Sequence, residues 1–116
     1  MRLSDKKLNS SLKREIINTF NQTLLDIDDK EKLSVFLNDF FTKAEYEVFA
    51  KRLAIAYWLK KGRSYNNIRD NLKVSSATIA TVQSQLNTKG MRLALKNIEA
   101  DEWANVWSER IKKFVK

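Results

Sequence analysis

The chain has 116 residues, no cysteine and no histidine, and a formal net charge of +8 at pH 7. The missing residue types exclude thiolate nucleophiles, disulfides, thiolate or imidazole metal sites and the usual general base near neutral pH. Because the chain also has only two glycines, it has no glycine-rich phosphate loop. We therefore expect no enzyme: no catalytic residue, no metal site and no cofactor.

The positive charge is concentrated in one segment. Residues 60–96 carry eight basic side chains against one acidic side chain, a net charge of +7. Residues 1–59 have a net charge of +1, and residues 97–116 a net charge of zero. This clustering predicts a polyanionic partner.

Hydrophobic residues make up 43% of the chain, enough to close the core of a single domain without disulfides. No stretch approaches the ~18 apolar residues that suggest a membrane-spanning helix. The N-terminal segment MRLSDKKLNSSLKREIINTF also lacks an apolar run of signal-peptide length. We therefore expect a cytoplasmic protein that makes no membrane contact.

The N-terminal third is predicted to form two amphipathic helices. Apolar residues recur there at helical spacing in two stripes, separated by the segment DIDD. The first stripe consists of Leu12, Ile16, Phe20, Leu24 and Ile27, and the second of Leu33, Phe36, Leu37, Phe40 and Phe41. No segment alternates with the period of a strand over a useful length, so the predicted fold class is all-α, with six or seven helices.

A third helix is predicted to begin after Thr42. The segment TKAE is a capping box, in which the side chains of Thr42 and Glu45 each bind the other residue's backbone N–H. Gly62 is well placed to end this helix. Its apolar stripe comprises Phe49, Leu53, Ala56 and Leu59.

The segment SYNNIRDNLKVSSATIATVQSQL, residues 64–86, is predicted to form a helix-turn-helix. Ser64 is a suitable N-cap for a short helix that ends at about Asn71, and Ser75 for a second helix that ends at about Asn87. The small core that two such helices share would consist of Ile68, Leu72, Val74, Ile79 and Val82.

The turn between these two helices carries Lys73 where glycine is common. Lysine can reach the left-handed conformation at some cost. On the second helix, at ~100° per residue, Ile79, Val82 and Leu86 face inward. The opposite face carries small residues that let the helix backbone enter a major groove about 12 Å wide. These outward residues are Ala77, Ala80, Thr81 and Ser84.

A last amphipathic helix is predicted near the C-terminus, with Asp101 as its cap. The residues that define it are Trp103, Val106, Trp107, Arg110, Ile111 and Phe114. We divide the chain into a helical domain at residues 1–98, with the helix-turn-helix at about residues 64–87, and this helix at residues 99–116, packed on the same domain.

The segments FFTKAEYEVFAKRLAIAYWLKKGRSYNNI and SSATIATVQSQLN resemble the tryptophan repressor superfamily, and in particular its shorter tryptophan-repressor-like members. The resemblance runs from about residue 14 to residue 96. It implies an intertwined helical homodimer and a DNA-binding transcriptional regulator on the bacterial nucleoid, with repression as the simplest output. Trp103 and Trp107 lie beyond the matched part, and we expect them in core or dimer packing.

The resemblance also points to the tryptophan pocket of the family. Thr42 and Arg52 match a threonine and an arginine that line this pocket, which makes them the candidate effector-binding residues. Thr81, however, stands where tryptophan-binding members have a second arginine, and Val82 where they have glycine. Loss of the guanidinium that would stack on the indole argues against tryptophan as the ligand. Arg52 is instead expected to form an internal ion pair or hydrogen bond.

We expect double-stranded DNA to be bound through two groups of residues. Phosphate contacts, which position the protein without reading sequence, are assigned to Lys60, Lys61, Arg63 and Arg69. The recognition helix would offer methyl and hydroxyl contacts, so that specificity depends on thymine methyls, bridging water and DNA shape. The full predicted interface comprises Lys60, Lys61, Arg63, Ser64, Asn66, Arg69, Ser75, Ser76, Ala77, Thr78, Ala80, Thr81, Gln83 and Ser84.

Two alternative functions remain open. The chain could supply the helix-turn-helix arm of a transposase-like system, which a neighbouring integrase gene would favour. It could instead be an interaction module whose basic face meets RNA or an acidic protein. Strong salt dependence without a preference for duplex DNA would favour the second alternative.

Overall fold

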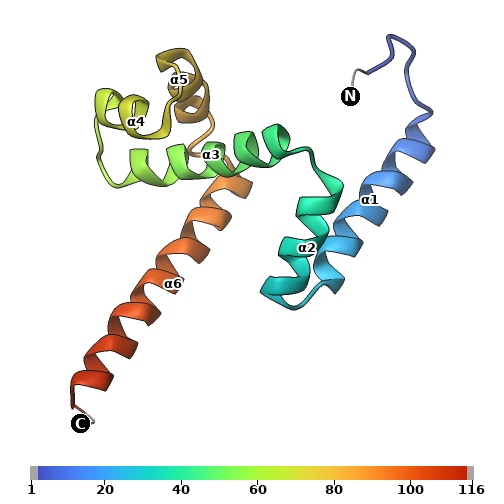
Figure 1. Cartoon of the computed structure of the whole chain (residues 1–116). Helices are drawn as coiled ribbons and strands as arrows, with labels where there is room; N and C mark the ends of the chain where they lie inside the picture. The colour runs from blue at the N-terminus through green and yellow to red at the C-terminus, as the bar shows by residue number, and fades with distance from the viewer. Residues whose placement is uncertain (1–2, 115–116) are drawn as a thin grey trace. The chain divides into compact units, whose positions relative to one another are not determined.

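The computed structural model describes residues 3–114, with side chains described as far as residue 105. Within this range the chain forms six α-helices and no strand (Figure 1), which confirms the all-α prediction. The helices are α1 (Ser10–Asp26), α2 (Lys30–Phe40), α3 (Lys43–Lys60), α4 (Tyr65–Leu72), α5 (Ser76–Ser84) and α6 (Lys89–Phe114). None of the described helices is both long enough and apolar enough to span a membrane.

The chain divides into two compact units, Met1–Tyr46 and Glu47–Lys116. In the first unit, α1 and α2 begin at side-chain caps. Asn9 accepts hydrogen bonds from the backbone N–H groups of Ser11 and Leu12 at 2.9 and 3.2 Å, and Asp29 accepts one from Glu31 at 2.7 Å. These bonds satisfy N–H groups that lack a partner within the helix. The predicted break at DIDD is thereby confirmed.

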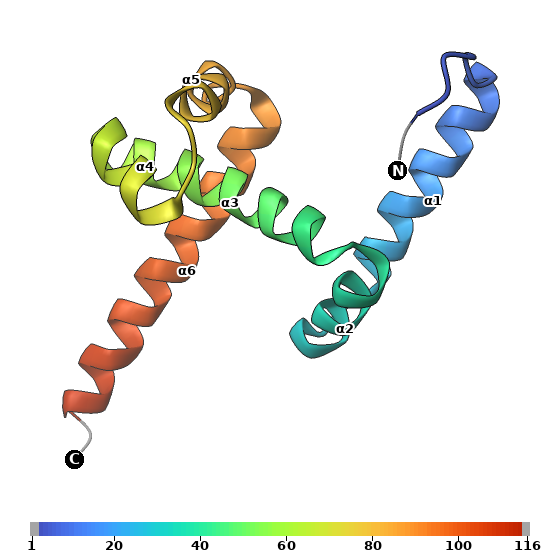
Figure 2. The same ribbon diagram turned by 45° about the horizontal axis from the view of Figure 1, so that its top comes forward.

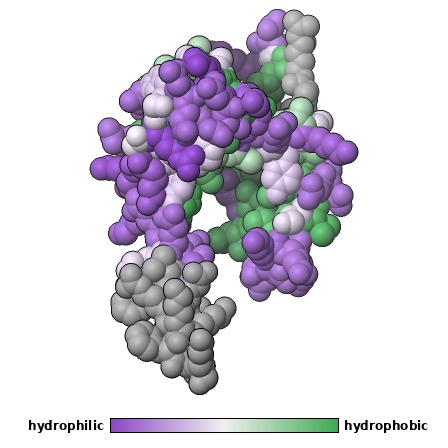
Figure 3. Space-filling model, turned by 60° about the vertical axis from the view of Figure 1, so that its left-hand side comes forward, coloured by the Kyte–Doolittle hydropathy of each residue, from purple (hydrophilic) through white to green (hydrophobic). Residues whose placement is uncertain are grey.

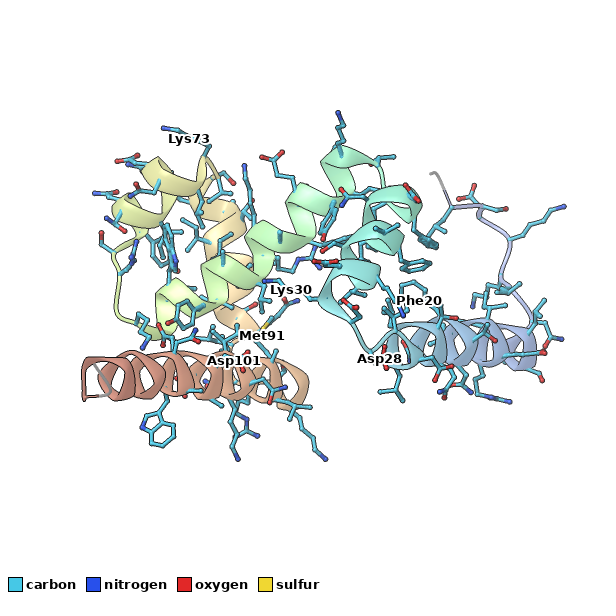
Figure 4. All side chains as sticks on the ribbon, turned by 60° about the horizontal axis from the view of Figure 1, so that its bottom comes forward. Phe20, Asp28, Lys30, Lys73, Met91 and Asp101 are labelled. Atoms are coloured by element: carbon cyan, nitrogen blue, oxygen red, sulfur yellow. The ribbon has the colours of Figure 1, made fainter. Side chains whose placement is uncertain are left out.

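Aromatic rings join the two helices of the first unit. The ring centroid of Phe20 on α1 lies 5.7 Å from that of Phe40 on α2, and Phe36 stacks on Phe40 at 5.2 Å. In Figure 4, Phe20 extends from α1 toward α2. Offset aromatic pairs at such distances add modestly to the stability that comes from burying their surface.

This aromatic contact leaves much apolar surface uncovered. No residue of α1 or α2 is buried, and Leu25 and Val35 are 76% and 62% exposed. Hydrophobic side chains are accordingly visible at the molecular surface in Figure 3. The first unit, taken by itself, therefore lacks the closed core that normally stabilises a folded domain.

The capping box predicted at Thr42 is confirmed. The Thr42 backbone N–H donates to the Glu45 carboxylate at 2.9 Å, and the Glu45 backbone N–H donates to the Thr42 hydroxyl oxygen at 3.1 Å. The bond from the Thr42 backbone stabilises the ionised carboxylate, which lowers the pKa of Glu45.

Gly62 ends α3, as predicted. Its φ angle of +83° is one that glycine adopts without steric cost. The backbone N–H of Gly62 donates to Leu59 at 3.0 Å and that of Arg63 donates to Trp58 at 3.1 Å. This pair of bonds is a Schellman motif, which satisfies carbonyls at the helix end and turns the chain toward α4.

The second unit has one apolar core, to which α3, α4, α5 and α6 all contribute. As far as residue 105, where side chains are described, its six buried residues are at most 2% exposed: Ile55, Ala56, Ile68, Ile79, Val82 and Leu95. Figures 1 and 2 show α4 and α5 as a pair beside α3, with α6 leading away as the longest helix. The predicted core of the helix-turn-helix is confirmed, since Leu72 and Val74 pack against the same cluster.

The apolar stripe predicted for α3 is only partly correct. Ala56 is buried and Leu59 packs against the core, but Phe49 and Leu53 are 44% and 40% exposed. Ile55, which the predicted stripe omits, is fully buried. Apolar residues occur all round this helix, so periodicity alone does not select the face that α4, α5 and α6 cover.

The predicted start of the last helix is wrong. Asp101 does not cap it but lies well within α6, which begins at Lys89 (Figure 4). Met91, Leu95 and Ile98 continue the helical period upstream and pack into the core, which extends the helix by three turns. The division of domains proposed at residues 98 and 99 therefore falls inside a continuous helix.

The structure tests the prediction of core packing for only one of the two C-terminal tryptophans. Trp103 is 65% exposed, so within the single chain it is not a core residue. Its expected role in dimer packing stays a prediction. The side chains of Val106, Trp107, Arg110, Ile111 and Phe114 lie outside the described residues.

The end of α5 comes earlier than predicted. The helix stops at Ser84 rather than near Asn87. Beyond it, the N–H groups of Gln85 and Leu86 donate to carbonyls three residues back, at 3.0 and 3.2 Å. This tighter pattern closes the helix and leads the chain into α6.

The turn between α4 and α5 has the predicted left-handed residue. Lys73 has φ 56° and ψ 54°, and its N–H donates to the Arg69 carbonyl at 2.9 Å. Ser64 caps α4 through the N–H of Asn67, and Ser75 caps α5 through the N–H of Thr78, both at 3.1 Å. Both predicted caps are confirmed.

Replacing Lys73 with glycine is expected to raise the free energy of unfolding by about 0.5–1 kcal/mol. The left-handed conformation costs an L-residue about 1–2 kcal/mol, and the greater chain entropy of unfolded glycine offsets part of that gain. Urea unfolding followed by circular dichroism measures the difference. Lys73→Val is the control and should lower stability, because a β-branched residue tolerates positive φ poorly. A less stable Lys73→Gly variant would contradict the argument.

Candidate nucleic-acid interface

The outward face of α5 has the form that the sequence predicts. Ile79 and Val82 are buried, whereas the residues of the opposite face are exposed. The exposed predicted contacts on α5 and its cap are Ser75, Ser76, Ala77, Thr78, Ala80, Thr81, Gln83 and Ser84. No long side chain except Gln83 projects from this helix, so its backbone can come close to a flat or grooved partner.

Two of the hydroxyl groups on α5 donate to their own helix. The Thr81 hydroxyl donates to the Ala77 carbonyl at 3.0 Å, and the Ser84 hydroxyl donates to the Thr81 carbonyl at 2.6 Å. Their oxygen atoms can still accept hydrogen bonds. The methyl groups of Ala80 and Thr81 stay on the exposed side. The face therefore offers methyl groups and acceptors rather than the fork of donors that an arginine presents.

A side-chain bond joins the two helices of the helix-turn-helix. The Tyr65 hydroxyl on α4 donates to the side-chain carbonyl oxygen of Gln83 on α5. The Gln83 amide NH2 keeps its own donors for another partner. Ser64 and Asn66 are exposed at the start of α4, on the same unit.

Both predicted phosphate-binding arginines have local partners. The Arg63 guanidinium lies 4.0 Å from the centroid of the Trp58 ring, and it donates to Asn67 at 3.4 Å. Stacking on the indole holds the planar cation while leaving N–H groups at its edge. Arg69 pairs with its neighbour Asp70 at 3.3 Å, with both side chains largely exposed.

The two predicted phosphate-binding lysines are paired with α6. Lys60 contacts Glu99 at 3.0 Å, and Lys61 contacts Glu102 at 3.2 Å. The Tyr57 hydroxyl donates to the same Glu102 carboxylate. We call these five residues the α3–α6 clasp. All five are on the second unit, and the lysines are about half exposed.

The clasp shifts the titration of three of its members. The Tyr57 hydroxyl and then Lys61 donate to Glu102, which lowers the pKa of Glu102. The hydrogen bond to Glu102, with some desolvation, raises the pKa of Tyr57, and the same carboxylate raises the pKa of Lys61. Each shift favours the protonation states that hold the clasp together at neutral pH.

Two further cations that are not among the residues predicted for the interface lie beside the turn. Lys51 and Lys73 meet Arg52 around an open hollow of about 350 Å³. Its other lining residues are Val48, Ile55, Val74, Ser75 and Thr78. Lys51 also pairs with Glu47 at 3.5 Å. The sequence could have indicated these two cations, because Lys73 occupies the left-handed turn position of the helix-turn-helix and Lys51 is the neighbour of Arg52 on α3.

The two candidate effector residues have other partners. Thr42 belongs to the first unit, where its hydroxyl and N–H form the capping box with Glu45. Arg52 belongs to the second unit and lies 5.7 Å from the centroid of the Phe49 ring. Among the described residues Arg52 has neither an ion pair nor a side-chain hydrogen bond, so a cation–π contact stands in place of the expected ion pair or hydrogen bond. Thr81 and Val82 occupy the positions at which tryptophan-binding members of the resembled superfamily have an arginine and a glycine.

The chain matches the family model described as Trp repressor protein over residues 15–97. It is also similar to the protein YerC of Bacillus subtilis (strain 168), which is described as uncharacterized. The two are 31% identical over 91 residues, which cover 77% of this chain and 86% of YerC. No solved structure gives a significant match.

The clasp is expected to stabilise the fold only in a middle range of pH. The lowered pKa of Glu102 means that its contribution is present above the unfolded value of about 4.3 and is lost as the pH falls through the folded value. The raised pKa values of Tyr57 and Lys61 mean that theirs are present below about 10 and are lost as the pH rises through the folded values.

The readout is the ionisation of Tyr57, measured by ultraviolet absorbance in a variant with Tyr46→Phe and Tyr65→Phe. We expect Glu102→Gln to lower the pKa of Tyr57 toward the ordinary tyrosine value. We also expect the free energy of unfolding of this variant to fall less than that of the wild type as the pH is lowered. The matched variant Asp101→Asn also removes one negative charge from α6 and should leave the pKa of Tyr57 unchanged. Equal shifts in both variants would show that Glu102 makes no specific contact.

Proposed function

Because the chain belongs to the Trp repressor family, whose members are helix-turn-helix DNA-binding regulators, we propose that it is a sequence-specific repressor of transcription that binds double-stranded DNA. The observation that carries the proposal is the exposed face of small residues on α5, set in a segment of net charge +7. The role that we propose is one of binding rather than catalysis, in the cytoplasm and on the bacterial nucleoid.

Positioning on the duplex would depend on the cations and caps around the helix-turn-helix. Arg69 is exposed in the last turn of α4, Arg63 is exposed just before the N-cap of this helix, and Lys60 and Lys61 precede Arg63. Their contacts with phosphates would fix the register without reading sequence. The polar residues Ser64, Asn66, Ser75 and Ser76 would add neutral hydrogen bonds to the backbone.

Sequence reading would fall to α5. The exposed methyl groups of Ala77, Ala80 and Thr81 suit thymine methyls, and the oxygen atoms of Thr78 and Ser84 can accept from bases or bridging water. Because this face carries no arginine, we do not expect it to make bidentate contacts with guanine. DNA shape and ordered water would then carry a large share of the specificity.

The active form that we propose is a homodimer joined through the first unit. Neither α1 nor α2 has a buried residue, and both expose large apolar side chains. A second copy would cover this surface, which is too extensive for a soluble monomer to leave open without a role. Two recognition helices would then address successive major grooves about 34 Å apart on a near-palindromic site.

We propose that tryptophan is not an effector of this protein. The family position for the second arginine holds Thr81, whose hydroxyl bonds to its own helix at 3.0 Å. Val82, at the glycine position, is buried in the core, and Arg52 stacks on Phe49. These residues supply neither the second cation nor the space beside the backbone that an indole ring would need.

Selection from a random DNA pool at near-physiological salt tests the sequence-specific function. We expect a two-fold-symmetric motif with half-sites about one helical turn apart. Substituting Thr81 or Ala80 should change the preferred bases, whereas Arg69→Gln should weaken all sequences alike. Tight binding at low salt with no enriched motif would contradict the repressor assignment and favour a non-specific nucleic-acid binder.

Light scattering combined with gel filtration tests the dimer. We expect the wild type to have twice the mass of one chain, and Leu12→Asp combined with Ile16→Asp to give a monomer. Both residues are about half exposed, at 45% and 50%, so a charge there should disturb a partner more than the chain's own packing. Leu93→Asp, at a site 63% exposed on α6, is the control and should remain dimeric. A monomeric wild type would contradict the proposal.

A further inference from the structure

The α3–α6 clasp occupies the two lysines that DNA binding would use. Lys60 ends α3 and Lys61 follows it, just before the helix-turn-helix, and each ammonium group lies within 3.2 Å of a glutamate on α6. Such a short N–O distance marks a direct ion pair with a charge-assisted hydrogen bond. The segment with net charge +7 is therefore partly neutralised by acidic residues that lie beyond it in the sequence.

Both glutamates of the clasp come from α6. Glu99 and Glu102 are three positions apart on α6, so they share one face of the helix. Glu102 uses both of its oxygen atoms, one for Lys61 and the other for Tyr57. Lys61 also lies 5.4 Å from the centroid of the Tyr57 ring. Tyr57, Lys61 and Glu102 thus form a connected network, and Lys60 with Glu99 forms a separate ion pair beside it in the clasp.

A phosphate group and a glutamate would compete for the same lysine. If DNA bound while the pairs stayed closed, two carboxylates would lie close to the phosphate backbone and repel it. The side chains of all four charged residues are between 42% and 50% exposed, and ion pairs at such exposure are weak. The lysines can therefore leave the clasp at small cost when a polyanion approaches.

We propose that Glu99 and Glu102 set the affinity of the protein for DNA by competing with the phosphate backbone for Lys60 and Lys61. This inference rests on the proposed DNA-binding function. On binding, two internal ion pairs are exchanged for two phosphate contacts, and α6 loses these contacts with α3. The glutamates lower the affinity for every DNA sequence by a similar factor, because phosphate contacts carry no sequence information.

A neighbouring acidic residue provides the matched control. Asp101 lies on α6 between the two glutamates and is exposed. Among the described residues it has no ion pair with a lysine or arginine. Asp101→Asn therefore makes the same change of charge on the same helix without freeing a lysine, and it separates competition from a general increase in positive charge.

The test is a double-mutant cycle on binding to a duplex of random sequence, followed by fluorescence anisotropy at one fixed salt concentration. Its four proteins are the wild type, Glu99→Gln with Glu102→Gln, Lys60→Gln with Lys61→Gln, and all four substitutions together. Circular dichroism confirms that each remains folded. We expect the glutamate variant to bind about 3- to 30-fold more tightly, because two exposed ion pairs no longer have to be broken.

The lysine substitutions decide the outcome. We expect them to abolish the gain of the glutamate variant, and to weaken binding more in that variant than in the wild type. Equal losses in both would show that the glutamates do not compete, and no loss in either would show that the lysines do not reach DNA. A gain from Asp101→Asn as large as that of the glutamate variant would also overturn the inference.

Elution from heparin, a polyanion other than DNA, tests the competition for the lysines separately from the proposed DNA-binding function. If the wild type fails to bind duplex DNA, the proposed function fails, but the same cycle can be measured as the salt concentration that elutes each protein from heparin. We then expect the glutamate variant to elute later than the wild type and the Asp101→Asn variant. Identical elution of the three proteins would overturn the competition itself.

Discussion

The burial of Ile68 and Ile79, one from each helix of the helix-turn-helix, is the interaction on which the rest of the second unit depends. Both side chains are fully buried in a core that also takes Ile55 from α3 and Leu95 from α6. Because α4 and α5 have only eight and nine residues, they would be marginal as isolated helices. Packing on α3 and α6 orders them, and this order holds the outward face of α5 rigidly enough to meet a partner.

Charge plays a different part from apolar packing in this molecule. No polar or charged side chain among the described residues is buried, so all of the ion pairs are at the surface. Such pairs contribute little to stability and are screened by salt. For the same reason they are easily exchanged, which suits a surface whose proposed partner is a polyanion. Arg63 differs from the cations in these ion pairs, since stacking on Trp58 holds it without neutralising its charge.

The two units differ in whether a single chain gives them a closed apolar core. The second unit has a closed core, whereas in the first unit contacts such as that between Phe20 and Phe40 leave α1 and α2 without a buried residue. Exposed large apolar side chains gathered in this way commonly mark an interaction site. The proposed homodimer follows from this difference, and it would make folding of the first unit dependent on protein concentration.

The sequence by itself determined the features that depend on residues a few positions apart. These are the capping box at Thr42, the helix end at Gly62, the left-handed Lys73, and the inward and outward faces of α5, because caps, turns and periodicity are local. Only the tertiary structure decided which face of α3 is buried, where α6 begins, and that Glu99 and Glu102 pair with Lys60 and Lys61. Those outcomes depend on contacts between helices far apart in the chain, which no local pattern encodes.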